Sequence, residues 1–126
     1  MDRFVNQDGM DFQDRTVQID LVFTAGTSGA VPSSFIYSNG ISGITLSGSN
    51  YTVALQDSYV ALLGTPPGTV IQASYSASGA TTAKVSAQNV TSGTAPTVTI
   101  TCYEANGTAT AMATGDTLYI TIRLKR

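Results

Sequence analysis

Short runs of alternating apolar and polar residues recur along this chain and constrain its fold more than any other feature. In the longest run, 116–126, the apolar positions are Leu118, Ile120, Ile122 and Leu124. Such period-two alternation is typical of a β-strand with one face on a core and the other toward solvent or a partner. No segment of ten or more residues has the 3.6-residue apolar period of a helix.

Seven further runs are expected to form strands: 16–23, 34–37, 42–47, 51–56, 69–75, 82–88 and 97–103. In 69–75 the expected inward face carries Ile71, Ala73 and Tyr75, and in 97–103 it carries Cys102 as a buried thiol. Gly, Asn and Pro, which favour turns, fill the segments between the runs. Eight or so short strands with regular breaks predict an all-β fold, an antiparallel β-sandwich or jelly roll.

The charged residues divide the chain into two parts. Between Leu21 and Gly115 the only charged residues are Asp57, Lys84 and Glu104, whereas six lie in the first fifteen: Asp2, Arg3, Asp8, Asp11, Asp14 and Arg15. We therefore expect an extended N-terminal arm over 1–15 and a single β-sandwich domain over 16–126. The apolar residues of the arm are its expected anchors: Phe4, Val5, Met10 and Phe12. A solvated tail is the alternative for the same segment.

The composition restricts the kinds of partner. Charged residues make up 11% of the chain, against about 25% in an average protein, and a surface with so little charge favours packing in an oligomer or assembly. The net charge of −2 argues against nucleic acid as a partner. No apolar stretch approaches the roughly 20 residues of a membrane span. With one cysteine and no signal peptide, synthesis in a reducing cytoplasm is expected.

The side chains needed for common catalytic chemistry are missing. There is no histidine, which excludes Ser-His-Asp and Cys-His sites and removes the commonest metal ligand. No cofactor-binding motif occurs, and one thiol cannot build a zinc site. We therefore expect no cofactor, no metal and no enzymatic activity. A pair of carboxylates, as in glycoside hydrolases, is the remaining enzymatic alternative, and its candidates are Asp20, Asp57, Glu104 and Asp116.

The segment YTVALQDSYVALLG at 51–64 changes from alternation to an apolar run, with QDSY between the two halves. We expect Asp57 or Ser58 to cap a single helical turn and Gly64 to close it in the left-handed conformation. The apolar residues of that turn would pack under the sandwich: Val60, Leu62 and Leu63. The segment is thus predicted to be a corner of the fold, with Tyr59 as an interface residue.

The same segment, with VTITCYEANGTATAMATGDTLYITIRLKR further on, resembles small virion proteins of tailed bacteriophages. The shared pattern is an aromatic-led strand running into an Asp-x-Tyr corner, a small-residue loop ending in Gly-Asp, and a final alternating strand with a basic end. The chain is similar to the jelly-roll capsid decoration (cement) proteins over roughly 51–126, and in outline before that. As a class these proteins sit on assembled heads, often as trimers at three-fold positions.

The resemblance implies a structural virion protein without an active site. It would bind the major capsid protein on the capsid exterior as a homotrimer and bridge neighbouring capsid subunits. The expected contact residues are Phe4, Phe12, Arg15, Tyr59, Tyr119, Arg123, Lys125 and Arg126. The main alternative is a head-fibre or tail component, or a receptor-binding knob that recognises carbohydrate through its threonine-rich faces with Tyr103 and Tyr119.

Overall fold

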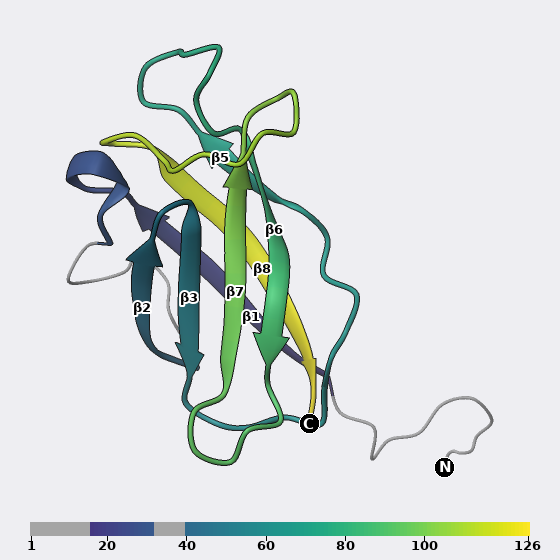
Figure 1. The fold of residues 1–126 in the computed structure, drawn as a ribbon. Coiled ribbons are helices and arrows are strands. Elements are labelled where there is room, and N and C mark those ends of the chain that lie inside the picture. The colour runs from purple at the N-terminus through teal and green to yellow at the C-terminus, as the bar shows by residue number, and fades with distance from the viewer. Residues whose placement is uncertain (1–15, 32–39) are drawn as a thin grey trace.

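The computed structural model describes residues 16–31 and 40–126 (Figure 1). Their regular structure is all strand apart from one 3-10 turn, η1 (Thr27–Gly29). The strands are β1 (Thr16–Thr24), β2 (Ile41–Ser47), β3 (Asn50–Leu55), β4 (Ala61–Leu62), β5 (Gly68–Ile71), β6 (Thr82–Asn89), β7 (Thr97–Tyr103) and β8 (Thr117–Lys125). The predicted arm, 1–15, and the predicted strand 34–37 lie outside the described residues.

The strands form one antiparallel sheet in the order β1-β8-β5-β6-β7-β3-β2, and β4 pairs with β8 outside this path. In Figure 1, β2, β3, β7 and β6 lie in front, while β1 and β8 cross behind them. Short β5 links the two layers, because it pairs with β8 on one side and with β6 on the other. The sheet therefore curls around one core, and the predicted all-β antiparallel fold is confirmed.

The inward-facing positions fill the space between the layers. All four apolar residues of β8 are buried, and they face buried residues of β1 in register, such as Leu21 opposite Ile120. The rings of Phe23 and Tyr51 meet edge to face across the core, with centroids 5.3 Å apart. Cys102 is fully buried on β7, as its place in the alternation predicts.

Strand β5 differs from its prediction, since it is shorter and turns its other face inward. Val70 is buried opposite Leu118, whereas Ile71 is exposed and Tyr75 lies exposed in the loop beyond the strand. Paired residues on neighbouring strands share a face, so pairing with β8 decides which side chains of β5 point inward. The strand ends at Ile71 because the chain turns into a loop, which the Gln72 side chain closes by bonding to backbone groups at Ser76 and Ala80.

The predicted helical turn after Asp57 is wrong. The segment is extended there, and the N–H groups of Val60 and Leu63 donate to the carbonyls of Lys125 and Arg123 (2.8 Å each). Gly64 does not adopt a positive φ. Because β8 offers backbone partners along its free edge, the chain forms strand β4 there instead of satisfying its own amides in a turn.

The apolar residues of this corner are accordingly less buried than expected. Val60 is 63% exposed, and Leu62 and Leu63 are half-buried. In a strand, successive side chains point to opposite faces, so they cannot all reach the core. The corner therefore lies along the edge of the back layer and does not pack under the sandwich.

Candidate functional site on the outer face of β1 and β8

Three of the predicted contact residues lie along one face of β8. Tyr119, Arg123 and Lys125 are at alternate positions of the strand, on the side opposite the buried apolar residues. Tyr119 is 47% exposed, and Arg123 is exposed as well. Their neighbours on β1 come from the same outer face, with Gln18 opposite Arg123. The fold thus gathers these side chains on the outer surface of the back layer.

The other predicted contact residues are placed differently. Tyr59 belongs to the hydrophobic core and is only 6% exposed, which leaves little of its ring for a partner. Arg126 lies over that ring, with the guanidinium carbon 5.5 Å from the ring centroid, and one of its guanidinium nitrogens lies 3.9 Å from a carboxylate oxygen of Asp57. Phe4, Phe12 and Arg15 lie outside the described residues.

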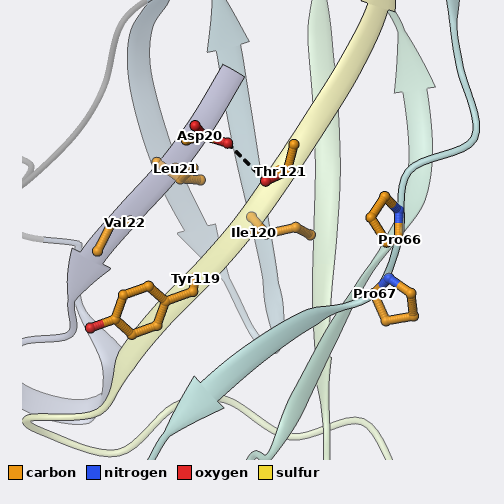
Figure 2. A pocket seen from close by; sticks show the side chains of 8 residues that line it. All are labelled: Asp20, Leu21, Val22, Pro66, Pro67, Tyr119, Ile120 and Thr121. Carbon is orange, nitrogen blue, oxygen red and sulfur yellow. Dashed lines mark hydrogen bonds between the residues drawn. The ribbon is translucent and has the colours of Figure 1, made fainter. Parts of the chain in front are cut away.

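A hollow of about 410 Å³ opens in the outer face of these two strands, and we call it the β8 groove (Figure 2). It is lined by Asp20, Leu21, Val22, Pro66, Pro67, Tyr119, Ile120 and Thr121. Figure 2 shows the two prolines on one side of β8 and the Tyr119 ring on the other, toward Val22. The groove therefore combines apolar walls, one exposed aromatic ring and one carboxylate.

Asp20 supplies the charge of the groove. Its Oδ1 accepts hydrogen bonds from the Thr121 hydroxyl (2.8 Å) and from the Gln18 amide (3.3 Å). Within 16–31 and 40–126 the one ion pair is that of Arg126 with Asp57, so no basic side chain of that part of the chain neutralises Asp20. The carboxylate is held in place by neutral groups and keeps its charge available to a ligand.

The groove exists because the pairing along β8 is interrupted. β4 pairs with β8 as far as Leu124 and β5 begins at Tyr119, and between them the chain passes Pro66 and Pro67. Proline has no N–H to donate, and no backbone hydrogen bond joins either proline to Thr121. The two prolines therefore stand away from the strand and form a wall instead of a further strand pair.

The other candidate carboxylates lie on different parts of the fold from Asp20 and form no pair with it. Asp116, 2% exposed, accepts hydrogen bonds from the backbone N–H groups of Ala73 (3.1 Å) and Ala113 (2.9 Å). It thus ties the β5–β6 loop to the β7–β8 loop. Glu104 begins a turn in which its N–H donates to Thr108. No group of three His, Cys, Asp or Glu side chains in the described segments is placed to hold a metal ion.

A second hollow, of about 390 Å³, lies on the other side of Pro67 beside β6 and β7. Its aromatic surface is already covered, because Lys84 places its ammonium group 5.6 Å from the centroid of the Tyr103 ring. Tyr119 has no such cover within the described residues. The β8 groove is therefore the better candidate for binding an external group.

Sequence reasoning identified Tyr119 but not the groove around it. The sequence names Asp20 only as a candidate for a pair of carboxylates, and it gives Pro66 and Pro67 no place in a predicted site. Their meeting depends on the pairing of β1 with β8, which joins the two ends of the described chain. The sequence signals for the groove are an aspartate on a polar face, two prolines before a strand and an outward-facing tyrosine. None of these signals predicts that the three features lie close together.

Comparisons with protein-family models, with curated proteins and with solved structures found no match. Within the described residues, no helix is long and apolar enough to cross a membrane.

Proposed function

We propose that this protein is a structural virion protein that binds the outside of a tailed-phage capsid and bridges neighbouring capsid subunits. The observation that supports this most is the outer face of β8, where Tyr119 and Arg123 are exposed beside a chemically varied groove. Aromatic residues and arginine are the side chains most enriched in protein interfaces. The resemblance of 51–126 to capsid decoration proteins supplies the kind of partner.

In this proposal the β domain is a rigid block and has no catalytic role. Its outer β1–β8 face contacts the major capsid protein, and the arm adds Phe4, Phe12 and Arg15 as further contacts. The weakly charged, threonine-rich sheet faces join three copies into a homotrimer. Such a trimer spans several capsid subunits at once, so that weak contacts combine into stable attachment.

Binding to heads tests the contribution of the arm. The full chain and a variant that lacks 1–15 are incubated with expanded heads of the phage that encodes the protein, and bound protein is measured after sedimentation. We expect the truncated variant to lose binding while circular dichroism reports an intact β domain. Unchanged binding by the truncated variant would refute the role of the arm.

The mass in solution tests the trimer. Light scattering on the full chain is expected to give about 39 kDa, three times the 13.0 kDa of one copy. A stable 13.0 kDa species at the highest concentrations would contradict the assembly on which the bridging mechanism depends.

A head-fibre, tail or receptor-binding component that recognises carbohydrate is the second candidate. The observation that favours it is the exposed Tyr119 ring beside the Asp20 carboxylate, because sugar sites combine an aromatic face with a polar group. A glycan array discriminates between the two. A specific hit that disappears in a Tyr119→Val variant would favour this second role over capsid attachment.

A further inference from the structure

We propose that the β8 groove binds the guanidinium group of an arginine side chain presented by a partner protein, between the Tyr119 ring and the Asp20 carboxylate. The inference goes beyond the virion role, since it concerns the chemistry of the contact and not the identity of the partner. If the partner is a capsid subunit, the groove would be one of its contacts.

The molecule already holds an arginine in this way at its C-terminal end. The guanidinium of Arg126 lies over the Tyr59 ring at 5.5 Å and approaches the Asp57 carboxylate at 3.9 Å. The ring attracts the cation through the negative potential of its face, and the carboxylate attracts it by charge. Asp57 and Tyr59 thus provide an example, within this fold, of an arginine placed beside both an aspartate and a tyrosine.

Asp20 and Tyr119 present the same two groups, a carboxylate and a phenol ring, but no cation of the described residues lies between them. Asp20 pairs with Thr121, and Tyr119 is two residues away along β8, so the two are diagonal neighbours on one face. Such residues lie about 7 Å apart, which leaves room for a flat group that touches the ring with its face and the carboxylate with its edge. Arg123 is the corresponding diagonal neighbour of Asp20 on the other side, and no ion pair joins the two.

The groups around the groove favour a cation over a sugar. Asp20 is the only charged residue in the lining, and the Thr121 hydroxyl already donates its hydrogen to it. The remaining side-chain donor is the Tyr119 hydroxyl, whereas a sugar site usually offers several donors to match hydroxyl oxygens. A guanidinium brings five N–H donors and a positive charge, and it suits a site made of acceptors and an aromatic ring.

The test titrates the full chain with N-acetyl-arginine amide and follows backbone amide resonances by NMR at low salt. N-acetyl-citrulline amide, which has the same shape but no charge, is the control ligand, and a set of methyl glycosides tests the sugar alternative. We expect saturable shifts centred on Tyr119 and Thr121 with the arginine compound alone. Because the groove is open to solvent, millimolar affinity is expected.

Three variants locate the site. Asp20→Asn keeps an oxygen that can accept from Thr121 but removes the charge, and we expect roughly tenfold weaker binding. Tyr119→Val is expected to weaken binding similarly without removing charge. Asp57→Asn is the matched control, since it makes the same chemical change outside the groove and should leave these shifts unaltered.

The proposal is overturned by equal binding of the citrulline compound, by full affinity in Asp20→Asn or in Tyr119→Val, or by absence of saturable shifts at the highest soluble concentration. Saturable binding of a glycoside in place of the arginine compound would also overturn it. If Asp20→Asn fails to fold, the Tyr119→Val variant and the citrulline comparison still decide the matter. None of these measurements involves capsids, so failure here and failure of the virion role are distinguishable.

Discussion

Burial changes the acid–base chemistry of two residues in the core. Desolvation raises the pKa of the Cys102 thiol to about 11, and the nearby Asp116 carboxylate contributes to the rise. Desolvation also raises the pKa of Tyr51, with smaller contributions from Cys102 and Asp116. The Tyr51 hydroxyl donates to the carbonyl of Gly29 at 2.7 Å. Both groups are therefore neutral in the folded protein at physiological pH.

The raised pKa of Cys102 predicts a specific loss of stability in alkali. The thiol ionises at 9.0 without burial and at about 11 in the folded state, so its contribution is complete below pH 9 and is lost as pH rises through 11. Two pKa units correspond to about 3 kcal/mol. Urea unfolding of the wild type and of Cys102→Ala is expected to show their difference shrinking by about this amount over that range. Tyr51 is present in both proteins, and the largest cause of its raised pKa is desolvation, so most of its titration cancels. Parallel pH profiles would contradict the assignment.

Asp116 is predicted to be a structural carboxylate whose loss is costly. In Asp116→Ala the N–H groups of Ala73 and Ala113 lose the acceptors that now bind them. An unsatisfied buried donor costs about 1–3 kcal/mol, so we expect a loss of about 2–4 kcal/mol in urea unfolding. The exposed Asp57→Ala is the control and should change stability by less than about 1 kcal/mol. Equal effects of the two substitutions would show that Asp116 does not fasten the loops.

At the scale of single elements, alternation predicts strands well where a strand is long. The inward positions of β1, β3, β7 and β8 follow from the sequence because three or four alternate residues agree on one face. β5 is four residues long, and its pairing with β8 decides its inward face. Strand β4 has two residues, which is too short for an alternation of apolar and polar residues. It is therefore identified only by its pairing with β8.

The groove could not be predicted for a related reason. Asp20 and Tyr119 each lie on a polar face that the sequence identifies, yet their proximity requires the register of β1 with β8, almost a full chain length apart. The gap beside Thr121 depends on where β4 ends and β5 begins. Local patterns give the face of a residue, and long-range pairing gives its neighbours.

The close packing of β5 against β8 gives a prediction for that element. A Cβ atom on Gly68 would lie 2.7 Å from the Tyr119 carbonyl oxygen and 2.8 Å from the Ile120 Cβ. Gly68→Ala must push the two strands apart, and we expect a loss of about 1–3 kcal/mol in urea unfolding. Gly64→Ala is the matched control, because no heavy atom lies within 4 Å of its added Cβ. Similar stabilities of the two variants would argue against this packing.

At the scale of the whole molecule, the charge distribution and the fold both favour a role in an assembly. The β domain has one core inside a curled sheet, and its outer faces are mainly threonine, serine and small apolar residues. Self-repulsion of such a surface is weak, which suits a protein that works in an assembly. The outer face of β1 and β8 is the exception, since it combines exposed arginine and tyrosine side chains with a half-buried aspartate.

Electron microscopy of expanded heads incubated with the full chain tests the proposed capsid attachment most directly. The heads come from the phage that is proposed to encode the protein, and heads without added protein are the control. We predict additional density on the outer capsid surface at three-fold or quasi-three-fold positions, with three copies at each. Density confined to the tail or to fibres, or heads identical to the control, would contradict the proposed role.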